Sequence, residues 1–137
     1  MSGDATIACD RTKRLDALVV RLRSRTYDVT DEARVQLAIA HTLSAAELPF
    51  SREVRLDDRS RIDFIVDDEG AEIGIEVKVD GSATSILRQC ARYIAHARIN
   101  ALIVATTRAR HVRELRNSLP QLDARVPCDV VLLRGAL

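Results

Sequence analysis

A strand-like run at residues 72–79 constrains this chain more than any other segment, because charged and apolar residues alternate along it. A β-strand points alternate side chains to opposite faces. One face is therefore aliphatic, whereas the other carries Glu76 and Lys78 after Gly74. Asp63 lies in the preceding strand-like run, residues 61–66. Two carboxylates on neighbouring strands, with a lysine beside one of them, predict a divalent-metal site.

The overall composition predicts one ordinary globular domain of 137 residues, with 47% hydrophobic and 30% charged residues. The net charge of +1 gives no overall attraction to nucleic acid. No apolar run approaches the roughly 18 residues of a membrane span, and the N-terminus does not resemble a secretory signal. The three cysteines are scattered and lack metal-ligand spacing. We therefore expect a cytoplasmic protein with reduced thiols and no membrane contact.

Lysine is rare in this chain, because only Lys13 and Lys78 are lysines among 21 cationic residues. Lys78 sits inside a predicted strand, two residues after Glu76. A compact ammonium fits beside a metal-bound water differently from a planar guanidinium. The rarity of lysine therefore draws attention to position 78.

Helical periodicity before the strands predicts two helices, at residues 10–25 and 31–46, with residues 1–9 loose. The charged face of the first helix fits either a solvated surface or a phosphate-contacting or partner-binding one. Thr30 is the expected N-cap of the second helix. Glu32 in its first turn is either a helix-dipole acid or part of a site.

The remaining pattern predicts strands at 52–56, 61–66, 72–79, 102–106 and 129–133, with helices at 81–97 and 109–119. Short turn-rich breaks between the first three strands favour an antiparallel meander. The run 102–106 is fully apolar, which is typical of a strand covered on both faces. We therefore predict an α/β fold with a mixed central sheet flanked by helices. His96 and His111 are expected at the surface.

The chemistry that this pattern suits is phosphodiester hydrolysis, which needs a nucleophilic water and stabilised charge on phosphoryl oxygens. Mg²⁺ is typically held by one or two carboxylates and keeps several waters. Asp63 and Glu76 could supply the carboxylates and the Val77 carbonyl a third oxygen, while Lys78 could orient the water or stabilise negative charge. Gln89 and Tyr93, spaced i, i+4 on the next helix, could face the same site.

The pattern of Asp63 and Glu76-x-Lys78, with twelve residues between Asp63 and Glu76, resembles the PD-(D/E)XK nuclease superfamily. The order of helix, three strands, helix and strand is similar to its shared restriction-endonuclease-like core. Gln89 and Tyr93 resemble the QxxxY motif of the RecB-type branch, and residues 61–66 resemble its aspartate strand, with Ile62 where a proline is usual. The resemblance implies an N-terminal helical extension at 1–27 and a nuclease core at 28–137.

By this resemblance the protein would be a Mg²⁺-dependent nuclease acting on DNA, with Mn²⁺ able to substitute. Asp63, Glu76 and the Val77 carbonyl would bind metal, and Lys78 would serve catalysis. Gln89 and Tyr93 would support the site or contact substrate, and Glu32 or Gln36 would take the place of a first-helix acid. The cysteine cluster of some RecB-type members is absent, so no iron–sulfur cluster is expected. A homodimer or a partner protein would be needed for sequence recognition.

Other interpretations of the same residues stay open. Glu76 and Lys78 could form a solvated ion pair on a sheet face, and Asp63 could be an ordinary outward polar residue. Tyr93 could be a core aromatic. Arg88 and Arg92 near the site are phosphate contacts or solvated side chains. The principal alternative function is a catalytically silent nuclease-fold module that binds nucleic acid or protein, and an unrelated α/β domain is a further one.

Overall fold

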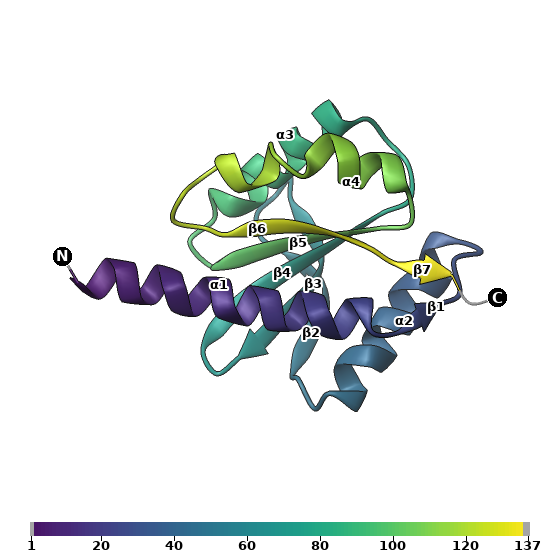
Figure 1. The fold of residues 1–137 in the computed structure, drawn as a ribbon, viewed down its shortest axis with the longest axis horizontal. Helices are drawn as coiled ribbons and strands as arrows, with labels where there is room; N and C mark the ends of the chain where they lie inside the picture. Colours follow the sequence, from purple (N-terminus) through teal and green to yellow (C-terminus); the bar gives the residue numbers. More distant parts are fainter. Residues whose placement is uncertain (1, 136–137) are drawn as a thin grey trace.

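The computed structural model describes residues 2–135, which fold around one five-stranded mixed sheet (Figure 1). In chain order, the sheet strands are β2 (Phe50–Arg55), β3 (Arg61–Asp68), β4 (Ala71–Lys78), β5 (Ala101–Thr106) and β6 (Cys128–Leu132). The helices are α1 (Ser2–Arg23), α2 (Glu32–Ala45), α3 (Ala83–Ile94) and α4 (Ala109–Leu115), with a 3₁₀ turn η1 (Leu119–Gln121). The α/β prediction is confirmed.

The strand order in space is the order along the chain, β2-β3-β4-β5-β6. β2, β3 and β4 form the expected antiparallel meander, whereas β4, β5 and β6 run parallel. α3 connects β4 to β5, and α4 with η1 connects β5 to β6. Parallel neighbours need such crossovers, which place a helix against the sheet. The end of β4 is thus joined directly to α3.

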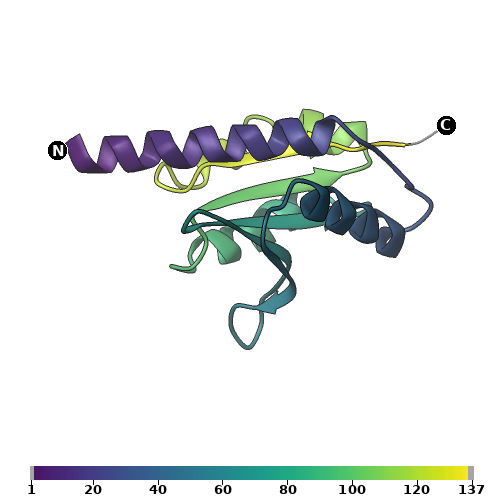
Figure 2. The ribbon, with the colours of Figure 1, turned by 90° about the horizontal axis from the view of Figure 1, so that it is seen from below.

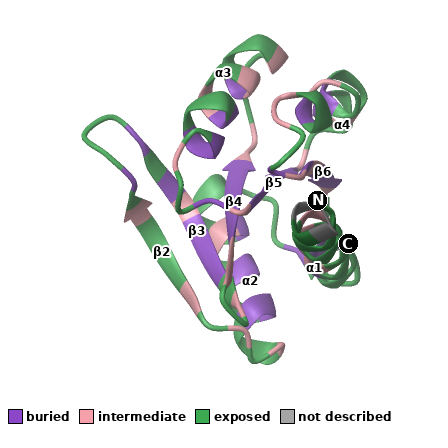
Figure 3. Cartoon of the chain, turned by 90° about the vertical axis from the view of Figure 1, so that its left-hand side faces the viewer, coloured by how far each residue is buried: buried purple, intermediate pink, exposed green. Residues whose placement is uncertain are grey.

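Two apolar cores lie on the two faces of the sheet, one under α1 and α2 and the other under α3 and α4 (Figure 3). All six residues of β5 are buried, which confirms the expected strand covered on both faces. Along β4, Ile73, Ile75 and Val77 pack into the core with α1 and α2. Glu76 is on the α3 face, as the alternation predicted.

The α3 face of β4 is tightly covered at Gly74. A Cβ at this position would lie 2.5 Å from Ile62 Cδ1 and 3.2 Å from Leu102 Cδ1. We therefore expect Gly74→Ala to cost about 1 kcal/mol or more through overpacking, although strand propensity alone favours alanine over glycine. Chemical denaturation measures this difference, with Gly3→Ala as the control because a Cβ there meets nothing within 4 Å. A more stable Gly74→Ala variant would contradict the packing.

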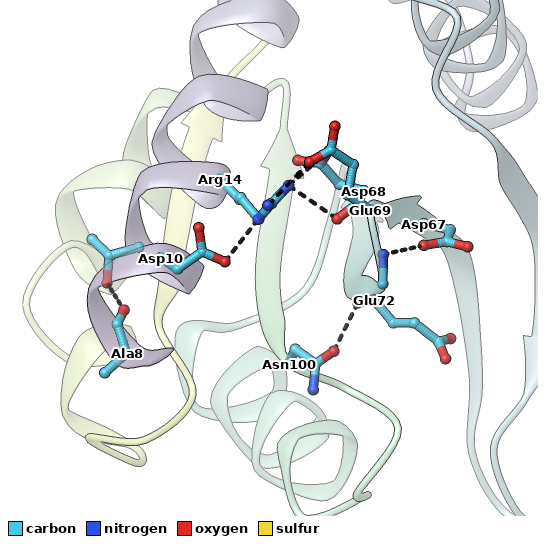
Figure 4. A network of polar contacts seen from close by, with 10 residues as sticks. Ala8, Asp10, Arg14, Asp67, Asp68, Glu69, Glu72 and Asn100 are labelled. Atoms are coloured by element: carbon cyan, nitrogen blue, oxygen red, sulfur yellow. Dashed lines mark hydrogen bonds and ion pairs between the residues drawn. The ribbon is translucent and has the colours of Figure 1, made fainter. Parts of the chain in front are cut away.

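The N-terminal helix begins much earlier than predicted, because residues 2–9 are helical and not loose. The helix lies across the sheet, and its N-terminal end extends past the strands (Figure 2). Its apolar periodicity starts only at Leu15, so the earlier turns gave no such signal. Polar contacts hold the preceding part: Arg14 pairs with Asp10 at 2.8 Å and reaches Asp68 and Glu69 in the β3–β4 turn (Figure 4).

Several other element ends differ from the prediction. Asp31, not Thr30, is the N-cap of α2, because its carboxylate accepts from the Arg34 amide at 2.8 Å, whereas Thr30 is bonded to Asp28. The predicted helix over 109–119 ends at Leu115, ahead of Pro120, which cannot continue a helix. An unpredicted parallel pair joins β1 (Thr26–Tyr27) to β7 (Arg134–Gly135).

α1 shares one apolar core with α2 and the sheet, through Leu15, Leu18, Val19 and Leu22. The division into an extension at 1–27 and a core at 28–137 stays a prediction. Within residues 2–135, none of the helices has both the length and the apolar character needed to cross a bilayer.

Candidate metal centre

The candidate site lies where β3 and β4 separate. Their antiparallel pairing runs from Asp68 and Ala71 to Phe64 and Ile75 and stops there. Beyond this point β3 pairs only with β2, whereas β4 continues to pair with β5 as far as Lys78. The two strands therefore form a fork in the sheet, and Asp63 and Glu76 are the first residues beyond its closed end.

The alternation of β3 breaks at Asp63. Ile62 and Ile65 both pack in the core under α3, although a regular strand would place residues three apart on opposite faces. The β2–β3 register passes from the Arg52–Phe64 pair to the Val54–Ile62 pair without pairing Glu53, which has a left-handed φ of 50°. A non-glycine residue in this region marks a local constraint on the backbone. This irregularity lies beside Asp63, whose carboxylate accepts a hydrogen bond from the Val77 amide on β4.

Side chains replace the missing backbone pairing at the fork. The Val77 amide donates to Asp63 Oδ2 at 2.8 Å, and the Asp63 amide donates to Glu76 Oε1 at 3.2 Å. The structure therefore brings Asp63 and Glu76 together at the fork.

Three further predicted residues contact Glu76 directly or through one neighbour. Lys78 Nζ lies 3.2 Å from Glu76 Oε2. The Tyr93 hydroxyl lies 3.0 Å from the same oxygen and accepts from Gln89 Nε2 at 2.7 Å. Glu76 is 4% exposed, so this is not the solvated ion pair of a sheet surface. The Lys78 ammonium acts as counter-ion to a carboxylate that is almost out of water.

Burial raises the pKa of both carboxyl groups. The pKa of Glu76 rises to about 7, first because the carboxylate is desolvated and then because the Asp63 charge repels it. The pKa of Asp63 is raised by desolvation, against the opposing effects of the Val77 amide, Glu76 and Lys78. Two ionised carboxylates held together in this way need more positive charge than the single Lys78 ammonium supplies. A divalent cation bound between them would supply that charge and favour the ionised forms.

The Tyr93 hydroxyl has two acceptors for a single proton. Besides Glu76 Oε2, the Arg61 carbonyl oxygen lies 2.8 Å away. If the phenol donates to Arg61, a bond to Glu76 requires a proton on the carboxyl group. This arrangement agrees with the raised pKa of Glu76. If the Glu76 carboxyl group lost its proton, the Tyr93 hydroxyl would donate to Glu76 instead, and the Arg61 carbonyl would lose its hydrogen bond from Tyr93.

The donors at the fork are hard oxygen ligands, which suit Mg²⁺ or Mn²⁺ better than zinc. N–H and C=O of one strand residue point to the same neighbouring strand. Because the Val77 amide points to Asp63, its carbonyl faces the fork as well. Among residues 2–135, no three His, Cys, Asp or Glu side chains converge as a metal-binding group. Two carboxylates and a carbonyl fit a cation that keeps several waters.

Other predicted site residues lie outside this cluster of contacts. Glu32 is exposed in the first turn of α2, where its carboxylate accepts from Gln36 at 3.5 Å. Arg88 and Arg92 are exposed and four residues apart on α3, and Arg92 lies three residues after Gln89, at helical spacing. Sequence reasoning missed Glu53, whose charge contributes to the raised pKa of Asp63, and the Arg61 carbonyl that Tyr93 contacts. Neither Glu53 nor the Arg61 carbonyl could be recognised from the sequence, because their contacts depend on how the strands are aligned.

Comparison of the chain with protein-family models and with curated proteins finds no match. The family resemblance therefore rests on the residues quoted above.

Tyr93 and Tyr27 offer a matched test of the site, since both are 1% exposed and both hydroxyls bond to backbone carbonyls. Each change to Phe should cost about 1–3 kcal/mol of unfolding free energy, because a carbonyl oxygen loses the hydroxyl that donates to it. Only Tyr93→Phe should also weaken Mn²⁺ binding, because only Tyr93 contacts Glu76. Calorimetry measures both quantities. Equal Mn²⁺ affinity in the two variants would show that Tyr93 does not contribute to the metal site.

Proposed function

We propose that the protein is a metal-dependent nuclease that hydrolyses phosphodiester bonds in DNA. The observation that carries the proposal is the convergence of Asp63, Glu76 and Lys78 at the β3–β4 fork. Support also comes from the topology, in which an antiparallel meander is followed by a crossover helix and a parallel strand. We propose that this sheet is the core of a restriction-endonuclease-like fold.

The proposed roles follow from position. Asp63, Glu76 and the Val77 carbonyl hold a Mg²⁺ ion, for which Mn²⁺ can substitute. When bound, such an ion lowers the pKa of a water ligand and offsets charge on phosphoryl oxygens. Lys78 is 23% exposed and close to Glu76, so its ammonium can orient the attacking water or stabilise negative charge. Gln89 and Tyr93 hold the Glu76 carboxylate in place. Arg88 and Arg92 are proposed contacts for substrate phosphates.

The testing experiment is cleavage of single-stranded, duplex and branched DNA, and of RNA of the same sequence, with Mg²⁺, Mn²⁺ or EDTA. The proposal expects cleavage of DNA with either metal and none with EDTA. Cleavage that persists in EDTA would contradict it. Binding of DNA and Mn²⁺ without cleavage would instead support the catalytically silent module.

A further inference from the structure

His111 is a buried residue that none of the proposed catalytic steps uses. It was expected at the surface but is 0% exposed, because α4 turns it toward the end of β5. Its Nδ1 lies 2.7 Å from Thr106 Oγ1, and its Nε2 lies 3.0 Å from the Gly81 carbonyl oxygen. A carbonyl can only accept, so Nε2 carries the proton and Nδ1 accepts from the Thr106 hydroxyl.

Both partners of His111 lead to the candidate site. Thr106 is the β5 residue paired with Lys78 in the parallel ladder. Gly81 lies in the short connection between Lys78 and α3, one residue before the α3 N-cap, Ser82. One histidine therefore links the end of the strand that carries Glu76 and Lys78 to the start of the helix that carries Gln89 and Tyr93.

Other side chains from the beginning of α4 hold the same connection. Arg108 Nε donates to the Val79 carbonyl at 2.8 Å, and Arg110 Nη2 donates to the Gly81 carbonyl at 3.3 Å. Asp80, Gly81 and Ser82 are exposed, so apolar packing does not fix this segment. Gly81 has a φ of 101°, which most other residues avoid. The conformation of the connection thus depends on these polar contacts.

We propose that His111 is a positioning residue that holds the β4–α3 connection and so fixes Lys78 relative to Gln89 and Tyr93. It acts through Gly81 and Thr106 and touches no reacting group. The inference rests on the proposed function only where cleavage is the measurement. A misplacement of about 1 Å at a reacting centre can cost 100-fold in rate, so a loosened connection has a measurable effect.

Two conservative variants separate the two bonds of the ring. In His111→Gln the amide nitrogen lies near the position of Nε2 and keeps the donor to Gly81. In His111→Asn the amide oxygen lies near Nδ1 and keeps the acceptor for Thr106, but the bond to Gly81 is lost. We expect kcat to fall about 10- to 100-fold in His111→Asn with KM little changed, and to stay within about threefold of wild type in His111→Gln.

A spectroscopic measurement makes the test independent of cleavage. The chain has only two lysines, so ¹³C-lysine labelling gives two Cε signals, from Lys13 and Lys78. His111→Asn should shift the Lys78 signal and the amide signals of Gly81 and Ser82, while the Lys13 signal stays in place. If wild-type protein cleaves nothing, the proposed function fails but these shifts still decide the role of His111.

If His111→Asn does not fold, Arg108→Gln provides the same test, because Arg108 is exposed and holds the Val79 carbonyl. Arg113→Gln, on the same helix and also exposed, is its control. A shifted Lys78 signal in Arg108→Gln but not in Arg113→Gln supports the proposal that side chains at the start of α4 hold the β4–α3 connection. An unchanged Lys78 signal in His111→Asn, or in Arg108→Gln where the former does not fold, would overturn the proposal.

Discussion

Replacing Glu76 with Gln is expected to lower the rate of metal-dependent DNA cleavage by about 1000-fold or more. The amide keeps the size of the side chain and its contact with Tyr93, but it removes the negative charge that a cation needs at the fork. The loss should therefore appear in kcat with the fold intact. Single-turnover cleavage with saturating Mg²⁺ measures it, and circular dichroism confirms folding.

The control for this variant is Glu72→Gln, the same change on the same strand and at a residue on the same face of β4. Glu72 pairs with Arg98 at 2.6 Å, away from the fork, and its change should leave the rate near that of wild type. Lys78→Met should behave like Glu76→Gln, whereas Lys13→Met on α1 should not. Substantial cleavage by Glu76→Gln or by Lys78→Met would contradict the mechanism.

The second large effect is a loss of stability of the metal-free protein as the pH rises from about 5 to 8. The pKa of Glu76 is raised from 4.5 to about 7 by folding, so between these values the folded protein binds more protons than the unfolded chain. This contribution to stability is complete below pH 4.5 and is lost as the pH rises through 7. Its size is on the order of 3 kcal/mol. The raised pKa of Asp63 acts in the same direction.

Thermal unfolding of wild type and Glu76→Gln across this pH range isolates the effect of Glu76 together with its interaction with Asp63, because more distant groups contribute to both curves alike. The lowered pKa values of Asp28, Asp57 and Asp123 act near pH 4 and below, outside the window. We expect the stability of Glu76→Gln to rise relative to that of wild type between pH 5 and pH 8. Mg²⁺ should raise the Tm of wild type more at pH 8 than at pH 5. If the stabilities of wild type and Glu76→Gln change in parallel with pH in the absence of metal, the raised pKa assigned to the buried Glu76 is contradicted.

Much of the fold could be predicted because its strands have clear patterns. Alternation along β4 correctly placed Glu76 on the face opposite Ile73, Ile75 and Val77. The unbroken apolar run of β5 correctly indicated a strand covered on both faces. Turn residues between short strands correctly indicated the meander. These are local signals, in which period and composition report burial directly.

What could not be predicted depends on contacts between distant segments. The first turns of α1 are held by Arg14, whose partners are a turn more than fifty residues away. The contact of Asp63 with β4 lies beside a break in β3 that the alternating residues do not show. The burial of His111 follows from its bonds to Thr106 and Gly81. A single sequence carries no local sign of any of these.

Paramagnetic broadening by Mn²⁺ tests the central claim most directly, because it reports where the cation binds. In protein labelled with ¹³C-lysine, the Lys78 Cε signal should disappear at substoichiometric Mn²⁺, since its ammonium lies 3.2 Å from a proposed ligand. The Lys13 signal should persist, and Asp63→Asn with Glu76→Gln should abolish the difference. If both lysine signals broaden equally, or if Lys78 is unaffected, the two carboxylates do not hold a cation and the account is wrong.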